Sequence, residues 1–174
     1  MIDKNTQDMI ILVDRNDREI GYEEKMKPHK EGRLHRAFSV FVFNSNGEML
    51  LQQRAKSKYH SGGLWTNTCC SHPRKGEKTE EAVHRRLSEE MGFDCDLDEK
   101  FNFIYKAKLD RGLTEHEFDH VFFGTYDGKV NPNPDEAYGY DWVAIEDLKK
   151  DMKLNPSKYT VWFKIALPKV LENL

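Results

Sequence analysis

The sequence predicts an α+β domain in which helices pack on a mixed β-sheet. Three observations favour this fold class: apolar runs separated by polar turns along most of the chain, one well-capped helical segment near the middle, and helical segments at the carboxyl end. The 174 residues suffice for one domain with its own hydrophobic core. No internal repeat, linker or low-complexity segment divides the chain, so we expect a single domain over residues 1–174.

The first half of the chain is expected to be mostly strand. Residues 9–25 (MIILVDRNDREIGYEEK) predict two strands joined by a polar turn at Arg15–Asp17. Residues 37–54 (AFSVFVFNSNGEMLLQQR) show the clearest hairpin pattern, with an apolar run, a turn at Asn44–Gly47 and a return strand. The segment GLWTNTCCSHP then starts extended and ends at its proline.

A central helix is expected from about Thr79 to Met91. Glu80 and Glu81 suit its first turn, where the helix dipole favours negative charge, and Gly92 suits a left-handed cap at its end. The remaining expected elements are two strands joined near Arg111–Gly112 within residues 100–126, a strand at 138–145, and helices at 145–152 and 157–174, the last disturbed by Pro168.

The composition is that of an ordinary protein surface in water. Charged residues make up 33% of the chain and the net charge is −3, so we expect no binding to nucleic acid or membranes. The amino-terminal MIDKNTQDMI lacks the basic start and apolar core of a signal peptide. Three cysteines without a secretion signal indicate free thiols in a reducing compartment, so we expect a cytoplasmic protein, and we predict no obligate protein partner.

One face of the expected central helix combines apolar and charged residues. Val83, Leu87 and Met91 share one helical face, and Arg86 and Glu90 form the neighbouring stripe, which places Glu90 at the edge of the buried side. A solvated helix with an Arg86–Glu90 ion pair, worth roughly a few tenths of a kcal/mol, explains this pattern equally well. The helix alone therefore leaves its role open.

Three histidines and a pair of glutamates offer metal-binding atoms. If TEHEF is a strand, Glu115 and Glu117 point to the same face, where their like charges repel unless a cation lies between them. His29, His35 and His72 lie elsewhere in the chain. Taken singly, each histidine is better explained as a surface or hydrogen-bonded residue, and the glutamates as an exposed strand face.

The stretch WTNTCCSHP contains two adjacent cysteines. Residues two apart share a face of an extended segment, so Cys70 is expected to lie with His72 while Cys69 points the opposite way. Cys69 then suits packing in the core, and Cys95 is interpreted as an incidental buried thiol.

The segment from Ser71 to Phe93 resembles the Nudix box, a strand–loop–helix signature, at six positions: Glu77, Arg85, Glu89, Glu90, Gly92 and Phe93. The resemblance implies a Nudix-like fold, a mixed sheet packed between helices, and box carboxylates that hold divalent cations against a diphosphate. Ser71 replaces the opening glycine of the box, and Arg86 stands where a carboxylate is expected. An arginine there weakens a hydrolytic multi-metal site and adds a fork-shaped donor for a phosphate oxygen.

A wider resemblance covers nearly the whole chain. Around the altered box lie, in order, KMKPHKEGRLHRAFSVFVFN, QQRAKSKYHSGGLWTNTCCSHP, FIYKAKL, LTEHEFDHVF, YDWV and YTVWF. Together they resemble the type I isopentenyl-diphosphate isomerases, Nudix-fold enzymes of isoprenoid synthesis. The family pattern differs at one spacing, since the interval from His29 to His35 is one residue shorter here.

This resemblance implies two metal sites and a diphosphate site. The implied ligands of the first ion are His29, His35, His72, Glu115 and Glu117, a set that suits zinc or manganese and suits magnesium less well. A second ion, magnesium, is implied at Glu90 with the bound diphosphate. The implied diphosphate contacts are Lys25, Arg54, Lys58 and Arg86.

The family reaction moves a double bond in a five-carbon isoprenoid diphosphate. A proton is added to one carbon, and another is removed two bonds away from the opposite face. The implied acid and base are Cys70 and Glu117, with Tyr105 to pass or orient a proton and Trp162 to stabilise the carbocation. From the residues alone, core packing on an amphipathic helix explains Trp162 equally well.

Two other functions remain open at this point. A Nudix pyrophosphohydrolase acting on a nucleotide explains the box, but it does not explain Arg86, the three histidines or Cys70. A non-catalytic Nudix module that binds a diphosphate or a partner explains the fold, although an intact Cys70 and Glu117 count against it. The resemblance favours isomerase activity on a small-molecule isoprenoid diphosphate over both.

Overall fold

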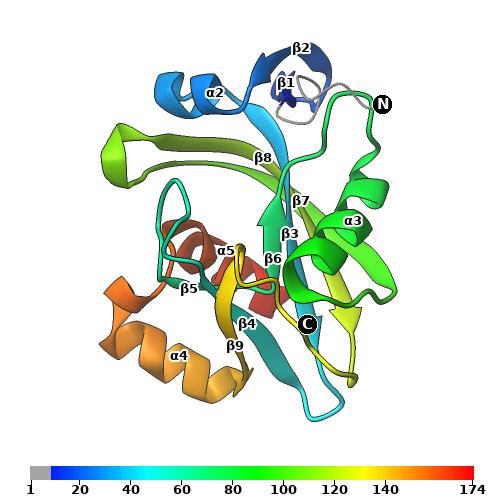
Figure 1. The fold of residues 1–174 in the computed structure, drawn as a ribbon, viewed down its shortest axis with the longest axis vertical. Coiled ribbons are helices and arrows are strands. Elements are labelled where there is room, and N and C mark those ends of the chain that lie inside the picture. Colours follow the sequence, from blue (N-terminus) through cyan, green and yellow to red (C-terminus); the bar gives the residue numbers. More distant parts are fainter. Residues whose placement is uncertain (1–8) are drawn as a thin grey trace.

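The computed structural model describes residues 9–174, whose strands form one mixed sheet (Figure 1). The strands are β1 (Met9–Val13), β2 (Glu19–Glu24), β3 (His35–Phe43), β4 (Glu48–Arg54), β5 (Trp65–Thr66), β6 (Cys69–Ser71), β7 (Leu97–Lys108), β8 (Thr114–Thr125) and β9 (Ala137–Ala144). The helices are α2 (Met26–Glu31), α3 (Thr79–Met91), α4 (Ile145–Leu154) and α5 (Val161–Glu172), with 3₁₀ turns at Asp110–Gly112 and Pro156–Lys158. Residues 1–8, which carry most of the signal-peptide argument, lie outside the described residues.

Strand β3 is the centre of the sheet. It pairs in parallel with β8 along its whole length, starting with His35 opposite Glu117. It also pairs antiparallel with β6, where Ser39 lies opposite Cys70. Strand β7 extends the sheet beyond β8, and β4 pairs with β5 and β9. Three segments far apart in the sequence, β3, β6 and β8, are therefore neighbours, and side chains on their common face meet.

The hairpin expected over residues 37–54 is only partly present. Both strands and the turn at Asn44–Gly47 form, but β3 and β4 pair only beside the turn, at Phe43 and Met49. The expectation of a regular hairpin is wrong because β3 is buried on both faces. A strand buried on both faces typically lies inside a sheet, where its partners come from distant segments.

Helices cover both faces of the sheet (Figure 1). On one face, Val83, Leu87 and Met91 of α3 are buried in a core cluster with Phe38 of β3 and Cys69 of β6. On the other face, apolar residues of α4 and α5 pack on the opposite side of β3, β4 and β8; they are Leu148, Trp162, Phe163, Ala166, Leu167 and Val170. The predicted fold class, a mixed sheet packed between helices, is confirmed.

The central helix has the predicted bounds. Glu80 and Glu81 lie in its first turn, and Gly92 closes it in the left-handed conformation, with φ of 72°. A Cβ atom on Gly92 would lie 2.1 Å from the backbone oxygen of Asn131, so only glycine fits there. The end of the helix therefore packs directly against the chain that leads to β9.

Two helical features differ from the prediction. Helix α2 was not predicted, because it has only six residues and Pro28 lies among them. Proline is tolerated in the first turn of a helix, but in a sequence it usually indicates a turn. The last helix begins at Val161 rather than near Ser157, after a 3₁₀ turn, and it continues through Pro168 to Glu172. Within residues 9–174, no helix is both long and apolar enough to cross a membrane.

Candidate active site and metal centre

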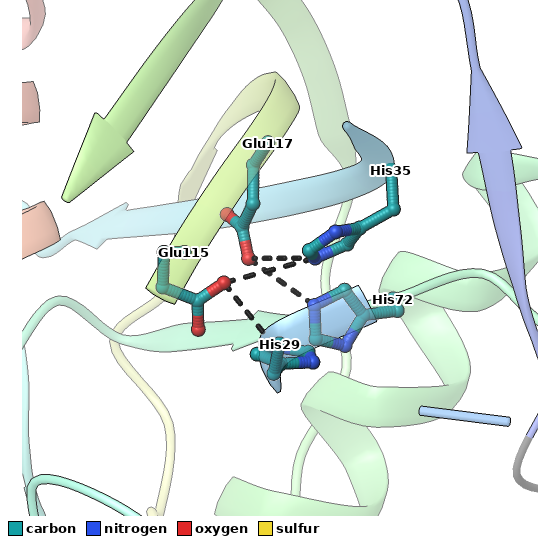
Figure 2. Close-up of side chains that lie close together, drawn as sticks. All are labelled: His29, His35, His72, Glu115 and Glu117. Atoms are coloured by element: carbon teal, nitrogen blue, oxygen red, sulfur yellow. Dashed lines mark hydrogen bonds and ion pairs between the residues drawn. The ribbon is translucent and has the colours of Figure 1, made fainter. Parts of the chain in front are cut away.

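Five potential metal ligands from four parts of the fold meet in one cluster (Figure 2). His29 comes from α2, His35 from the start of β3, His72 from the chain after β6, and the two glutamates, Glu115 and Glu117, from β8. One ligand atom of each residue lies within 4.8 Å of one from every other. The structure brings all five predicted ligands together, including His29, despite its shorter spacing from His35.

The sheet explains why this cluster forms. Glu115 and Glu117 point to the same face of β8 because side chains alternate along a strand. The parallel pairing with β3 places His35 directly opposite Glu117. Gly32, in the left-handed conformation with φ of 67°, ends α2 and accepts a hydrogen bond from Nδ1 of His116 on β8, which holds His29 over the strand.

The imidazole rings are oriented with their Nε2 atoms toward the centre. Nδ1 of His29 lies 2.7 Å from the carbonyl oxygen of Lys25, and Nδ1 of His35 lies 2.9 Å from that of Arg33. Each Nδ1–H therefore donates outward, and each Nε2 lone pair faces inward. In the described residues both Nε2 atoms are buried without a hydrogen-bond partner, as is Oε2 of Glu115.

The distances in the cluster fit a shared cation. Nε2 of His29 lies 3.3 Å from Oε2 of Glu115, and Nε2 of His72 lies 3.1 Å from Oε1 of Glu117. Nε2 of His35 lies 3.7 and 3.6 Å from the same two oxygens. Ligands bound at about 2.1 Å lie about 3 Å apart when adjacent and about 4 Å apart when opposite. These buried, inward-facing atoms therefore suit a divalent metal ion.

The charges in the cluster lead to the same conclusion. Burial raises the pKa of Glu117, and the neighbouring Glu115 raises it further, because two like charges in a buried site repel. Burial also acts to raise the pKa of Glu115, but its contacts with His29 and His35 outweigh burial and lower it. A divalent cation between the two carboxylates removes their repulsion.

A second wall of the same cavity carries Cys70, which lines it together with His72, Tyr105 and Glu117. Its Sγ lies 3.0 Å from Oδ1 of Asn67, to which the thiol donates. Burial raises the pKa of Cys70, so the thiol keeps its proton at neutral pH. The adjacent Cys69 is fully buried under α3. Cys95 is half-buried and packs against the same hydrophobic core beneath α3, away from the metal-binding cluster.

Glu117 is held from two sides. Its Oε1 faces His35 and His72, and its Oε2 accepts a hydrogen bond of 2.7 Å from the hydroxyl of Tyr105. Tyr105 lies directly opposite Glu117 in the β7–β8 ladder. Burial raises the pKa of Tyr105, so the phenol remains a hydrogen-bond donor to the carboxylate.

Four cations line the cavity: Lys25, Arg54, Lys58 and Arg86. Burial, helped by the charges of Lys58 and Arg86, lowers the pKa of Lys25 to about 8. Arg86 donates to Glu90 at 2.6 Å and to Glu136 at 3.1 Å, and Lys58 also binds Glu136. The four cations thus line one cavity, and two of them, Lys58 and Arg86, share the carboxylate of Glu136, which the sequence did not indicate.

Trp162 lies in the first turn of α5, where it both packs in the core and borders the cavity. It is 5% exposed and belongs to the core under the helix, yet it also lines the cavity. The guanidinium of Arg54 lies over its ring, 5.1 Å from the centroid. Its Nε1 is buried without a hydrogen-bond partner in the described part of the chain.

Similarity to known proteins identifies the family. A model of the NUDIX domain matches residues 33–163. Isopentenyl-diphosphate Delta-isomerase 2 of Aromatoleum aromaticum is 51% identical over 165 residues, which are 95% of this chain and 87% of that protein. This chain belongs to the isopentenyl-diphosphate Δ-isomerase family of Nudix proteins. The isopentenyl-diphosphate Delta-isomerase of Serratia proteamaculans, 53% identical over 156 residues, covers 90% of this chain and 87% of its own length.

Solved structures agree with the fold of this isomerase family member. The crystal structure of DR0079 from Deinococcus radiodurans matches with a TM-score of 0.75 and 20% identity, covering 92% of this chain and 98% of that one. At that identity the likeness extends to the Nudix fold alone. The resemblance drawn from the sequence motifs is confirmed by the family match.

Several residues around this isomerase site were not found from the sequence. They are Ser39, Tyr59, His60, Asn67 and Glu136. Ser39 comes within 3.5 Å of the Cys70 thiol only through the pairing of β3 with β6. His60 and Glu136 lie in irregular segments, where no strand or helix periodicity indicates which way a side chain points.

Proposed function

We propose that this chain interconverts isopentenyl diphosphate and dimethylallyl diphosphate. The observation that carries the proposal is a single cavity lined by the thiol of Cys70, the carboxylate of Glu117 and four cationic side chains. The two isomerases named above, each about half identical in sequence, support the same activity. We also propose a cytoplasmic location, consistent with three free cysteines.

The reaction is an acid–base exchange. The S–H bond of Cys70 breaks as its proton forms a C–H bond at the terminal alkene carbon, which leaves positive charge on the tertiary carbon. Glu117 then takes a proton from the carbon two bonds away, and the electron pair of that C–H bond becomes the new double bond. Cys70 ends as a thiolate and Glu117 as an acid, so after product release Glu117 gives its proton to solvent and Cys70 takes one from solvent before the next turnover.

Two aromatic residues support this exchange. Tyr105, bonded to Oε2 of Glu117, orients the carboxylate that accepts the proton. Trp162 presents its indole to the cavity, where an aromatic face stabilises a cation by about 2 kcal/mol when water is excluded. The face of the indole stabilises the carbocation through its π electrons and does not present a lone pair that would trap it.

The five-residue cluster would hold the catalytic metal ion, for which we propose zinc or manganese. When bound, such an ion fixes the position of Glu117 and tunes its affinity for a proton. We propose that Lys25, Arg54, Lys58 and Arg86 bind the diphosphate and that Glu90 holds a magnesium ion beside it. Glu90 is buried and accepts a hydrogen bond of 2.8 Å from Gln52, so its carboxylate is already oriented.

The box itself argues against a hydrolase. Arg86 donates to Glu89 and Glu90, both at 2.6 Å, and Arg85 donates to Glu77, at 2.6 and 2.9 Å. Arg86 thus replaces one box carboxylate and pairs with two others, which leaves fewer free carboxylate oxygens to gather several metal ions; the Arg85–Glu77 pair lies at positions that match the box and does not separate the two functions. The altered box suits holding a diphosphate better than cleaving one.

Product analysis tests the function. Purified protein with a divalent metal is incubated with isopentenyl diphosphate and, separately, with a nucleoside diphosphate conjugate. We expect the allylic isomer without release of phosphate. Release of phosphate from the nucleotide would instead support a hydrolase, and neither product would support a binding module.

Arg86 provides a test of the diphosphate site. Replacing it with glutamine removes the charged fork and is expected to raise the KM for isopentenyl diphosphate by roughly 10- to 100-fold, with a smaller change in kcat. Arg15→Gln, at an exposed position in the β1–β2 turn, serves as the control and should leave KM unchanged. An unchanged KM in Arg86→Gln would contradict the role of Arg86 as a diphosphate clamp.

A further inference from the structure

His60 occupies an unexplained place beside the metal-binding cluster. It lies in the loop between β4 and β5 and is only 2% exposed. Its Nε2 atom is buried, has no hydrogen-bond partner in residues 9–174, and lies 3.3 Å from Oε1 of Glu115. A buried ring nitrogen directed at one oxygen of a candidate metal ligand calls for a function.

The two oxygens of Glu115 face different partners. Oε2 lies 3.3 Å from Nε2 of His29 and 3.7 Å from Nε2 of His35, and so faces the centre of the cluster. Oε1 faces away from this centre, toward His60. This arrangement lets one oxygen bind an ion while the other accepts a hydrogen bond.

We propose that His60 is a positioning residue that donates its Nε2–H to Oε1 of Glu115 and thereby directs Oε2 to the metal ion. The inference rests on the metal centre proposed above. Ligating carboxylates are commonly held by such outer hydrogen bonds, whose loss weakens metal binding by roughly 10- to 100-fold. His60 acts through Glu115 and does not itself bind the ion.

The surroundings of His60 hold its ring in the orientation that this role needs. Nδ1 lies 3.1 Å from the hydroxyl of Ser61, which donates to it and leaves the ring proton on Nε2. The backbone N–H of Ser61 donates to the carboxylate of Asp110 at 2.9 Å, which anchors the loop to the β7–β8 connection. The carbonyl of His60 accepts from Nη2 of Arg54 at 3.1 Å.

The same ring supports the opposite wall of the cavity. Its edge meets the indole of Trp162 at right angles, with centroids 5.4 Å apart. His60 therefore links a metal ligand, an aromatic wall and a diphosphate-binding arginine through one loop. Substitution of His60 is expected to change metal affinity first, because its Nε2 atom faces the carboxylate of Glu115.

The test compares two replacements by their affinity for Mn²⁺, measured from the electron paramagnetic resonance signal of the free ion. His60→Gln keeps an N–H donor near the position of Nε2 and is expected to bind Mn²⁺ with nearly wild-type affinity. His60→Leu fills similar space without a donor and is expected to bind Mn²⁺ roughly 10- to 100-fold more weakly. Thermal unfolding of both metal-free variants reports any loss of fold separately.

The outcomes separate this inference from the function on which it rests. Equal affinities in the Leu and Gln variants, whether both normal or both weakened, would overturn the role of His60 as a donor while leaving the metal centre intact. A wild-type protein that binds no Mn²⁺ would overturn the centre as well.

If His60→Leu does not fold, Ser61→Ala is tested in its place. This change removes the hydroxyl that fixes the tautomer of the His60 ring, and it should weaken Mn²⁺ binding without shifting the unfolding temperature of the metal-free protein. Unchanged Mn²⁺ binding would count against the inference. His84→Leu, at a partly exposed position on α3, is the matched control.

Discussion

Cys70→Ala is expected to abolish isomerisation, while Cys69→Ala leaves turnover nearly unchanged. The two cysteines are adjacent in β6, but only Cys70 lines the cavity with Tyr105 and Glu117. Positioned acid–base groups contribute roughly 10²–10⁴-fold in rate, and protonation of carbon is demanding, so we expect a loss of at least about 10³-fold. Alanine carries no proton to donate, and the hydroxyl of a serine holds its proton too tightly to substitute well.

The two variants should rank the other way in stability: Cys69→Ala is expected to be destabilised, and Cys70→Ala is not. Cys69 is fully buried between the sheet and α3, so its truncation leaves a small cavity and is expected to lower the free energy of unfolding by about 1 kcal/mol. Cys70 borders a cavity already, so Cys70→Ala should unfold near the wild-type temperature. Turnover at saturating substrate and thermal unfolding of both variants provide the measurement. An inactive Cys69→Ala beside an active Cys70→Ala would show that the wrong thiol has been assigned.

The parts of the site that could be predicted depend on local geometry. The alternation of side chains along a strand was enough to place Glu115 with Glu117, and Cys70 with His72. The bounds of α3 followed from its capping residues, since a glycine in the left-handed conformation ends a helix wherever the rest of the chain lies. In each case the signal and its structural result lie within a few residues of one another.

The unpredicted parts depend on contacts between distant segments. The parallel pairing of β3 with β8 joins residues about eighty positions apart, and the apparent hairpin at Asn44–Gly47 masked it. The continuous apolar run of β3 was the available sign, because a strand buried on both faces needs partners on both sides. The joint ligand set came from family resemblance, since no local pattern connects His29 on a six-residue helix with β8.

Glu136 illustrates the same limit at the proposed diphosphate site. It lies in the irregular segment before β9, where its sequence context, NPDEAY, reads as a solvated turn. In the structure its carboxylate binds both Lys58 and Arg86, two of the four predicted diphosphate contacts. The pairing of β9 with β4, which sets Ala137 opposite Arg54, brings this carboxylate beside the two cations.

Removing one proposed metal ligand, His72, is the second change with a large expected effect. His72→Asn should lose both the bound metal ion and the isomerase activity, because asparagine is too short to reach the position of Nε2, which lies 3.1 Å from Oε1 of Glu117. The fold should persist, since in residues 9–174 His72 lies outside the three core clusters, which pack around α3, around α4 and α5, and around β1. Metal content of the purified variant is the direct measurement.

Thermal unfolding with and without added metal gives an independent reading of the same change. A ligand that binds only the folded state stabilises it by RT ln(1 + [L]/Kd), about 2.7 kcal/mol at a concentration one hundred times Kd. Wild-type protein should therefore unfold at a clearly higher temperature with metal present, and His72→Asn should show almost no shift. His84→Asn, whose side chain is 41% exposed on α3, should respond like wild type. A His72→Asn protein that retains stoichiometric metal and the full shift would remove His72 from the ligand set and leave Glu117 to be held by His35 and Tyr105 alone.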